Sequence, residues 1–373
     1  MKVVIGQGSC GIASGAQQTA GEFERYIKEM NIRNVTIEKT GCIGACFLEP
    51  IVDIYSAEEE LEGRYVNVFP EKVEEIAKAH LICGKTADTY LISKENEEYL
   101  NLQKRVVMRN CGQINPESID DYTKKGGYKA AEKAVKEMQP ENIIDEMEAS
   151  GLRGRGGAGF PVWKKWKATR EQESDVKYVI CNGDEGDPGA FIDRALLEGD
   201  PHNIIEGMII CAYAVGASSG IMYVRAEYPL AVERLEKALK QAEGKGFLGK
   251  NIFGSDFSFD ITLRIGAGAF VCGEETALIA SLEGQQGLPK IRPPYPSKRG
   301  YWKKPTNVNN IETLANVPYI IENGGALLAS MGTEKSKGTK VFALAGKAKR
   351  GGLIEVPMGT TLKEIIFDIA GGI

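Results

Sequence analysis

Residues 178–194 read YVICNGDEGDPGAFIDR, and this stretch decides the fold class. Tyr178–Ile180 is a short apolar run typical of a buried strand, and a polar, glycine-containing turn follows it directly. Strands of α/β sheets bind ligands at their carboxyl ends, so the amide and carboxylates of this turn are candidates for ligand contact. Four acids within ten residues are equally common on solvated surface, and the residues alone leave both interpretations open.

Around this strand, helical and strand-like segments alternate from about residue 126 onward. This alternation favours a mainly parallel sheet flanked by helices. Residues 291–310 are rich in Pro, Lys and Asn, and we expect an extended loop there. The expected helices are 130–138, 141–149, 204–217, 230–242 and 274–282, and the expected further strands are 221–225, 261–265 and 341–344.

The two ends of the chain follow other patterns. Residues 1–85 suit a thioredoxin-like sandwich. Residues 86–125 are polar and mixed, so we expect a connector that packs on the next domain. Residues 335–373 look like the start of a β-grasp domain that is not completed, which predicts that the natural protein continues. The elements expected near the N-terminus are strands 2–5, 35–38, 51–55 and 65–69 and helices 17–30 and 70–80.

The composition excludes several classes of function. A chain of 373 residues predicts two or three domains. The net charge is -5, without a long basic run, which argues against nucleic acid and anionic membranes as partners. No apolar run is long enough for membrane insertion, and the N-terminus MKVVIGQGSC is not a signal peptide, so we expect a cytoplasmic protein. The eight cysteines are not spaced as a disulfide framework.

A glycine-rich stretch, GLRGRGGAGFP at residues 151–161, is the strongest chemical signal. A helix is expected before it and not a strand, so it does not fit the Rossmann turn that binds dinucleotides. Glycines nevertheless let backbone N–H groups approach an anion, and Arg153, Arg155, Lys164 and Lys165 supply positive charge. A flexible surface loop is the less favoured alternative.

Two further blocks carry polar groups. GAGAFVCGEETALIASLEG at residues 266–284 leads into a helix whose N-terminus favours an anion or an electron-rich ring edge. KPTNVNNIETL at residues 304–314 offers the paired amides of Asn309 and Asn310, although asparagines in turns are commoner. No arrangement of His or Tyr suits acid–base catalysis on a small organic substrate.

Together the four blocks resemble the flavin- and NADH-binding subunit of complex I and of the NAD-linked, electron-bifurcating soluble hydrogenases. In that family, GRGGAGFP, N-x-D-E-x-x-P-G, G-A-G-x-x-x-C-G-E-E-T-A-L and V-N-N-x-E-T build the FMN and NADH site. Here they occur in the same order between Gly151 and Leu314. The resemblance implies a Rossmann-like α/β domain at residues 126–330 that binds FMN and NAD(H).

Carried over position by position, the resemblance implies two sets of contacts. Asp187 replaces the usual glutamate, Phe270 stands where Tyr is common and Arg292 where Lys is seen, which leaves NADH versus NADPH open. No side chain is assigned as catalytic, because the flavin itself transfers the hydride. The implied FMN contacts are Gly154, Arg155, Gly157, Lys165, Asn182, Asp184, Glu185, Phe270, Glu274, Asn309 and Asn310, and the implied nucleotide contacts are Phe160, Asp187, Glu275, Arg292 and Tyr295.

Residues 1–85 resemble the thioredoxin-like ferredoxin module that is fused to such subunits. Cys10, Cys42 and Cys46 match three ligands of its [2Fe–2S] cluster. Such a cluster takes four cysteines, and no cysteine precedes Cys10. A degenerate domain without a cluster and a cluster with an unusual fourth ligand remain alternatives. The family's [4Fe–4S] cluster is expected only in a C-terminal domain absent from this chain, since no C-x-x-C-x-x-C occurs.

The resemblance implies an NAD(P)H dehydrogenase subunit that passes electrons through FMN to iron–sulfur partners. The implied partners are a ferredoxin-like iron–sulfur subunit and a hydrogenase, formate dehydrogenase or similar catalytic subunit, in a complex that bifurcates electrons. The alternative is a flavin-free scaffold of such a complex. A flavin spectrum in the purified protein separates the two.

Overall fold

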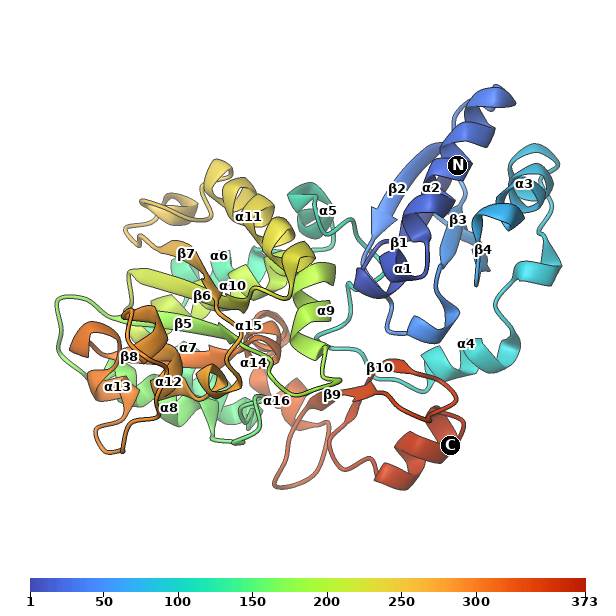
Figure 1. Ribbon diagram of the computed structural model, residues 1–373. Coiled ribbons are helices and arrows are strands. Elements are labelled where there is room, and N and C mark those ends of the chain that lie inside the picture. The colour runs from blue at the N-terminus through green and yellow to red at the C-terminus, as the bar shows by residue number, and fades with distance from the viewer.

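The computed structural model describes residues 1–373, and its N-terminal unit is a four-stranded sheet flanked by helices (Figure 1). The strand order is β2-β1-β3-β4, with β1 and β2 parallel and the other two pairs antiparallel. This order confirms the thioredoxin-like prediction. The elements are β1 (Lys2–Gly6), α1 (Ser9–Ala13), α2 (Ala16–Glu29), β2 (Thr36–Thr40), β3 (Val52–Tyr55), β4 (Leu61–Tyr65) and α3 (Val73–Ala77).

The last strand of this sheet was predicted at the wrong place. The sequence favoured residues 65–69, whereas β4 occupies Leu61–Tyr65. The turn closes early, because the N–H of Ser56 donates to the carbonyl of Glu60 at 2.9 Å. As an edge strand, β4 exposes Leu61 and Glu62, and its polar composition hides it from a search for apolar runs.

The connector packs against the rest of the molecule. It contains α4 (Lys94–Asn101) and α5 (Ile119–Lys124). Between these helices, Val106, Val107 and Met108 are buried in the main hydrophobic core. Residues 106–108 therefore pack on the core of the central unit, and the bounds of the connector stay a prediction.

The central unit is built on a parallel four-stranded sheet in the order β7-β6-β5-β8. The expected alternation of strands and helices is confirmed, and none of the helices combines the length and the hydropathy that crossing a membrane requires. The strands are β5 (Tyr178–Gly183), β6 (Ser219–Arg225), β7 (Asp260–Gly266) and β8 (Thr306–Asn310). The helices are α6 (Lys129–Glu137), α7 (Pro140–Ser150), α8 (Val162–Arg170), α9 (Ile192–Gly199), α10 (Pro201–Val215), α11 (Pro229–Gly244), α12 (Glu275–Leu282), α13 (Pro296–Arg299), α14 (Ile311–Ala315), α15 (Val317–Asn323) and α16 (Gly325–Ala329).

The expectation of an extended loop at 291–310 is wrong, because this segment contains α13 and the strand β8. The sequence of β8, TNVNN, has a single apolar residue. Its two buried asparagines are satisfied within the protein: the Asn309 amide donates to Asn307 Oδ1 at 2.7 Å, and the Asn307 amide donates to Thr169 Oγ1 at 2.8 Å. Buried polar groups are tolerated when they are hydrogen-bonded, so this strand cannot be recognised by hydropathy.

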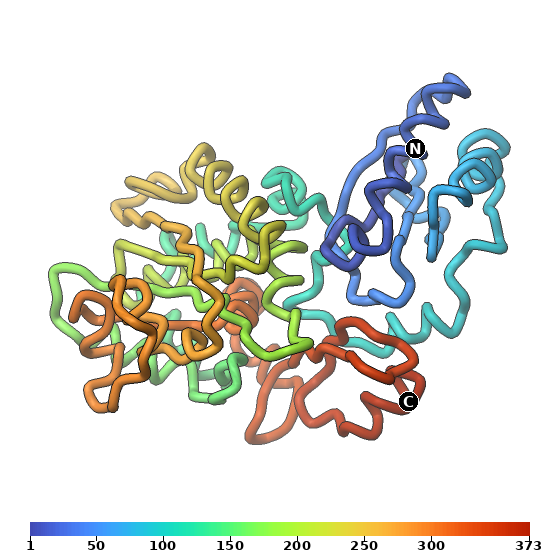
Figure 2. The backbone as a smooth tube through the Cα atoms, in the orientation of Figure 1, coloured from blue at the N-terminus to red at the C-terminus, as the bar shows by residue number.

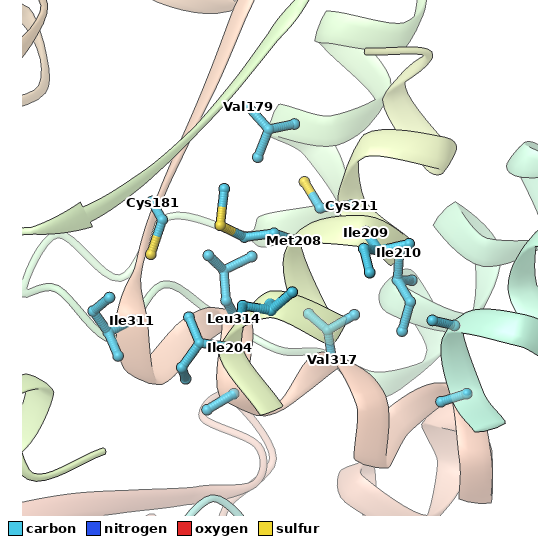
Figure 3. Close-up of a cluster of buried hydrophobic side chains, with 14 of the residues drawn as sticks. Val179, Cys181, Ile204, Met208, Ile209, Ile210, Cys211, Ile311, Leu314 and Val317 are labelled. Atoms are coloured by element: carbon cyan, nitrogen blue, oxygen red, sulfur yellow. The ribbon is translucent and has the colours of Figure 1, made fainter. Parts of the chain in front are cut away.

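Helix α10 lies at the centre of the core, between the sheet and the outer helices (Figure 3). Fourteen of its fifteen residues are buried, which explains why its sequence is apolar on all sides. Met208 and Cys211 pack toward Val179 and Cys181 of β5, and Ile204 packs toward α14. Helix α10 thereby holds one face of the sheet, and the carboxyl ends of the strands lie outside this packing.

The C-terminal hairpin lies beneath the N-terminal unit and α4 (Figure 2). It consists of β9 (Thr339–Leu344) and β10 (Gly352–Pro357), which pair antiparallel. Ile354 and Val356 share a small core with Ile43 and Tyr99, so the hairpin, the N-terminal unit and the connector pack as one body. The expected strand at 341–344 is confirmed, and a partial β-grasp domain stays a prediction.

A single arginine joins the N-terminal unit to the central unit. Arg234 of α11 is 1% exposed. Its guanidinium donates to the carbonyl of Glu198 at 2.6 Å and to the carbonyl of Gln7 at 2.8 Å. Glu117 lies 3.6 Å from its Nε. Three segments that are far apart in the sequence thus contact the cation, although its Nε makes no hydrogen bond.

A buried histidine should make the fold sensitive to mild acid. His202 shares hydrogen bonds with Tyr128 and Gln241, and burial lowers its pKa to about 4. An unfolded chain binds a proton near pH 6.5, so stability is lost as the pH falls from about 6.5 toward 4, by up to about 3 kcal/mol. His202→Gln should flatten this slope in urea unfolding between pH 4.5 and 7. An unchanged slope in the variant would contradict the assignment.

Candidate functional site

The sheet has a topological switch point between β5 and β8. The chain runs from β5 through α9 and α10 to β6 on one side, and returns much later to β8 on the other side. The two strands end together, because Asn182 pairs with Asn310 in the register. In open α/β sheets, ligands bind in the crevice outside such a point.

The glycine-rich loop lies on this crevice. An ideal Cβ on Gly156 would stand 3.1 Å from Cβ of Asn310, so the backbone can approach β8 only as glycine. Gly157 and Gly159 have φ of +110° and +60° and face open space. The N–H of Gly154 closes the loop onto the carbonyl of Phe160 at 2.9 Å, but no N–H of residues 156–160 donates to a protein acceptor. Successive free N–H groups of this kind are able to receive an anion.

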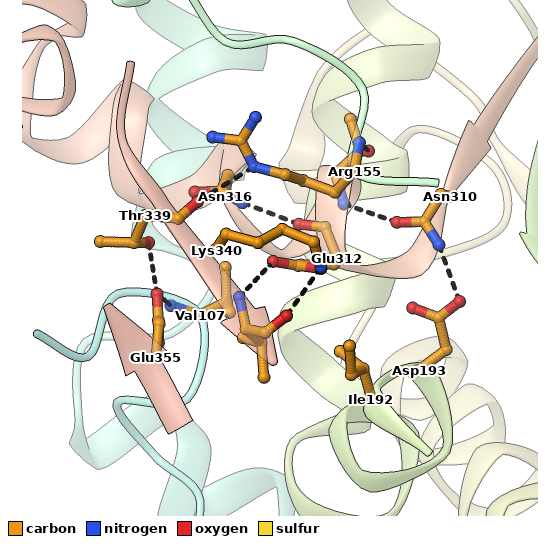
Figure 4. A network of polar contacts seen from close by, with 12 residues as sticks. Val107, Arg155, Ile192, Asp193, Asn310, Glu312, Asn316, Thr339, Lys340 and Glu355 are labelled. Carbon is orange, nitrogen blue, oxygen red and sulfur yellow. Dashed lines mark hydrogen bonds and ion pairs between the residues drawn. The ribbon is translucent and has the colours of Figure 1, made fainter. Parts of the chain in front are cut away.

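The two predicted cations of this region behave differently. Arg155 is buried and turned away, because its guanidinium donates to the carbonyls of Thr339, Arg153 and Lys337. Figure 4 shows the guanidinium pointing toward Thr339. Contact between Arg155 and FMN stays a prediction. Lys165 remains at the sheet edge, where Nζ donates to the carbonyl of Val308, and burial lowers its pKa.

The turn after β5 presents one carboxylate with an unsatisfied oxygen. The amide of Asn182 donates to the carbonyl of Gly273 at 3.0 Å, which joins this turn to the loop before α12. Asp184 is 8% exposed and lies 3.4 Å from Arg225 of β6, and its Oδ2 has no partner. Burial raises the pKa of Asp184 to about 6, and Arg225 opposes this shift. A ligand hydroxyl or amide would satisfy the free oxygen.

Arg225 was not singled out from the sequence. Arg225 is the last residue of the strand expected at 221–225, and it therefore lies at the same carboxyl edge of the sheet as Asn182. This position could have identified Arg225 as a candidate site residue. It also donates to the carbonyl of Glu185 at 3.1 Å. Arg225 therefore holds the acidic turn in place from the neighbouring strand.

Glu185 has a structural role that the sequence did not reveal. Its carboxylate accepts the N–H groups of Ile192, Asp193 and Arg194, at 2.7, 3.2 and 3.2 Å, and so caps the N-terminus of α9. Tyr228 also donates to it at 3.2 Å. All these bonds are made within the protein, and contact between Glu185 and FMN stays a prediction.

Removing this cap should lower the stability of the fold as well as any activity. Glu185→Ala leaves three N–H groups at the start of α9 without an acceptor, and loss of a cap costs about 0.5–2 kcal/mol. The melting temperature should therefore fall clearly below that of Glu173→Ala, an exposed acid outside the site. Equal melting temperatures for the two variants would restore the original interpretation.

The loop before α12 places aromatic side chains at the mouth of the crevice. Phe270 is 67% exposed and lies directly over Gly186, whose ideal Cβ would stand 2.6 Å from its ring. Phe160 and Tyr295 are also more than half exposed. Large exposed rings of this kind mark a binding surface when they gather at one site.

The two glutamates at the start of α12 are already paired. Glu274 caps the helix by accepting the N–H groups of Thr276 and Ala277, at 2.9 and 3.0 Å. Glu275 accepts from Arg292 at 2.6 Å, and Arg292 stacks near the ring of Tyr295. The predicted nucleotide residues Glu275, Arg292 and Tyr295 thus lie together, and Asp187 lies in an exposed turn next to Gly186, which the Phe270 ring covers.

The paired asparagines of β8 point to opposite faces. Asn309 is buried, and its amide donates to Asn307 Oδ1. Contact between Asn309 and FMN stays a prediction. Asn310 lies at the edge, where it caps α14 and donates to Asp193 at 2.7 Å (Figure 4).

Three cysteines of the N-terminal unit converge at its contact with α9. The Sγ atoms of Cys10, Cys42 and Cys46 all lie within 4.8 Å of one another. Sulfur ligands at this spacing are compatible with a zinc or iron–sulfur site. All eight cysteines of the chain are free of disulfide bonds.

A glycine loop with free N–H groups at the switch point of a parallel sheet defines a nucleotide-binding α/β protein. Comparison with known proteins shows which nucleotide-binding proteins the chain is similar to. Residues 147–319 match the model of the Nuo51 FMN-binding domain. The homologues of the chain are subunits of NADH-quinone oxidoreductases and of NAD- and NADP-reducing hydrogenases.

Three relatives illustrate the range of the family. The chain is 59% identical over 270 residues to the NADP-reducing hydrogenase subunit HndC of Solidesulfovibrio fructosivorans, covering 72% of this chain and 55% of that protein. It is 50% identical over 274 residues to an NADH-quinone oxidoreductase subunit of Aquifex aeolicus, covering 74% and 64%. The crystal structure of an air-oxidised NAD⁺-reducing [NiFe]-hydrogenase matches all of this chain and 61% of its own, at 28% identity and a TM-score of 0.61. The chain thus spans less than two thirds of each relative.

Proposed function

We propose that this chain binds FMN at the β5–β8 crevice and passes electrons from NAD(P)H to iron–sulfur partners. The observation that carries the proposal is the run of free N–H groups at residues 156–160, next to the unsatisfied Oδ2 of Asp184. Both are groups that a phosphorylated, hydroxyl-rich cofactor satisfies. The match of residues 147–319 to an FMN-binding domain supports the same cofactor.

The residues around the crevice divide the binding of FMN between them. Gly154 and Gly157 belong to the loop whose N–H groups would receive an anion, and Lys165 adds the nearest cation. Asp184 would accept from a hydroxyl, and Asn182 holds the turn that carries it. When bound, FMN accepts a hydride and releases single electrons. The protein supplies position, charge and exclusion of water.

The nicotinamide nucleotide is proposed to bind over the exposed rings of Phe160, Phe270 and Tyr295. Aromatic faces stack on planar rings of a ligand, and Arg292 and Glu275 form a polar pair at the same mouth. NADH and NADPH both remain candidates. HndC is described as part of an NADP-reducing enzyme and the Aquifex relative as part of an NADH-quinone oxidoreductase.

The wider assignment rests on the relatives. We propose a cytoplasmic multi-subunit complex with a ferredoxin-like subunit and a hydrogenase, formate dehydrogenase or similar catalytic subunit, in which electron bifurcation is the expected mode. The domain division at 1–85, 86–125, 126–330 and 335–373 belongs to the same proposal. The alternative of a flavin-free scaffold is disfavoured by the crevice, since a scaffold does not need five free N–H groups at one edge.

The test is a cofactor measurement on the purified chain. Extraction should yield close to one FMN per chain, and the protein should reduce an artificial electron acceptor with NADH or NADPH. Apoprotein reconstituted with riboflavin should bind more weakly than with FMN, because the glycine loop would have no phosphate to hold. A protein that neither retains nor rebinds FMN would be the scaffold.

The carboxylate of Asp187 should influence the choice of nucleotide. A carboxylate near the adenine ribose accepts from the 2′-hydroxyl and repels a 2′-phosphate. Because Asp is one methylene shorter than Glu, we expect a modest preference for NADH, which Asp187→Glu sharpens and Asp187→Ala relaxes toward NADPH. The measurement is the ratio of kcat/KM for the two nucleotides at fixed ionic strength. A strong NADPH preference in the wild type, or a ratio unmoved by both substitutions, would count against this role.

A further inference from the structure

The three converging cysteines have the geometry of a single-ion site. Cys10 lies in α1, and Cys42 and Cys46 lie in the loop after β2. The sulfur of Cys46 is 3.1 Å from that of Cys10 and 3.7 Å from that of Cys42. The N–H of Gly44 points at the sulfur of Cys42, 3.3 Å away, as is favourable for a thiolate. All three sulfurs therefore face one point.

This arrangement does not fit the [2Fe–2S] cluster of thioredoxin-like ferredoxins. Such a cluster takes four cysteines, two on each iron. The position five residues before Cys10 holds Ile5, which is fully buried in β1. No other cysteine, histidine or carboxylate joins the three sulfurs within 4.8 Å. Half of a dinuclear cluster would lack ligands here.

A buried carboxylate beside the sulfurs has one free oxygen. Glu49 is 4% exposed, and its Oε2 accepts the N–H of Ile51 at 2.9 Å. Its Oε1 is buried and has no partner. Ideal Cβ atoms on Gly6 and Gly11 would each stand 3.1 Å from its Oε2, so the carboxylate packs against the end of β1 and against α1. An unpartnered buried oxygen next to three thiols is unfavourable unless something else occupies the site.

Positive charge is supplied from the central unit. Arg194 of α9 lies against Cys10, and its Nε is buried without a hydrogen-bond partner. On the same helix, Glu198 accepts both the N–H and the hydroxyl of Ser9, at 2.8 and 2.6 Å. The central unit thus closes over the cysteines and offsets the negative charge of thiolates.

We propose that Cys10, Cys42, Cys46 and Glu49 bind one divalent, thiophilic metal ion, with Zn²⁺ as the expected occupant. With Zn–S bonds of about 2.3 Å, tetrahedral geometry requires sulfurs about 3.8 Å apart, close to the observed spacing. No carboxylate oxygen of Glu49 lies within 4.8 Å of all three sulfurs, so Oε1 has to move toward them to take the fourth position. The thiols release their protons to solvent on binding, and no electron is transferred. The ion joins α1 to the loop after β2 within the N-terminal unit and is redox-silent.

The decisive measurement is an inventory of metal and sulfide in the 373-residue chain. We expect one zinc per chain, no acid-labile sulfide, and no cluster absorption after reduction. One iron per chain without labile sulfide would overturn zinc as the occupant. Two irons with two labile sulfides would overturn the proposal in favour of a cluster. A metal-free protein that also fails to bind added Zn²⁺ would overturn it too. FMN content, measured on the same sample, keeps this outcome separate from the flavin assignment.

Variants identify the ligands. In metal-free protein titrated with Co²⁺, thiolate-to-cobalt charge-transfer absorption should appear at one equivalent. Cys10→Ser and Glu49→Gln should each weaken Zn²⁺ binding at least tenfold, and Cys83→Ser, which changes an exposed cysteine outside the site, should bind as the wild type does. Circular dichroism checks that each variant is folded. Unchanged affinity in Glu49→Gln would overturn the carboxylate ligand, and unchanged affinity in Cys10→Ser would overturn the site.

Discussion

Replacing Gly157 with leucine is expected to reduce the FMN content of the purified protein to less than a tenth of the wild-type value. Gly157 has φ of +110°, and an ideal Cβ there meets no protein atom within 4 Å. The space that the new side chain would enter is the crevice itself. A branched side chain would prevent the cofactor from approaching the free N–H groups of the loop. The ratio of flavin to protein absorbance measures the effect.

The backbone strain of this substitution requires its own control. Gly249 has nearly the same conformation, with φ of +103°, and also faces open space, but it lies beside Phe259 at the amino end of β7. Gly249→Leu should therefore cost similar stability and leave the FMN content unchanged. Equal flavin loss in both variants would mean that strain, and not occupation of the crevice, removes the cofactor. Full flavin content in Gly157→Leu would move the binding site elsewhere.

Removal of the Glu355 carboxylate is expected to destabilise the fold by about 3–5 kcal/mol. Glu355 of β10 is fully buried, and it accepts the N–H groups of Val107 and Met108 at 3.1 and 3.0 Å and the hydroxyl of Thr339 (Figure 4). Glu355→Ala would leave all three donors buried without a partner. Each unsatisfied group costs about 1–3 kcal/mol. Urea unfolding measures the loss.

Two further variants separate the lost hydrogen bonds from a general effect of mutation. Glu355→Gln keeps one oxygen that can accept, so its loss should be smaller than that of the alanine variant. Glu322→Ala changes an exposed acid on α15 and should stay within about 0.5 kcal/mol of the wild type. If Glu355→Ala also stays within that range, the connector and the C-terminal hairpin are not joined through this residue.

Periodic apolar patterns were reliable guides to the fold. The strand at 178–180 and the helix at 204–217 were predicted because buried segments made of apolar residues can be recognised in the sequence. Both lie in the core. The strand β8 was missed for the opposite reason. Its buried side chains are amides whose partners come from α8 and from β8 itself, and a hydrogen bond between distant segments leaves no trace in local hydropathy.

The candidate site shows a similar division. The glycine loop was recognisable because free backbone N–H groups require glycine, and the crevice forms where the strand order predicts it. The roles of Arg155, Glu185 and Asn309 could not be predicted, since residue type indicates a polar task but not its partner. In all three, the side chain is used by the protein itself.

The buried guanidinium of Arg234 makes the N-terminal unit difficult to detach. Its partners include the backbone of Gln7, so cutting the chain after the thioredoxin-like unit would leave a fully enclosed cation short of an acceptor and uncover the surface of α9. Removing this unit to obtain a minimal flavoprotein would therefore expose a surface that is prone to aggregation and carries a cation without its acceptor. Grafting the unit onto another flavin domain would require transplanting the arginine and its acceptors as well.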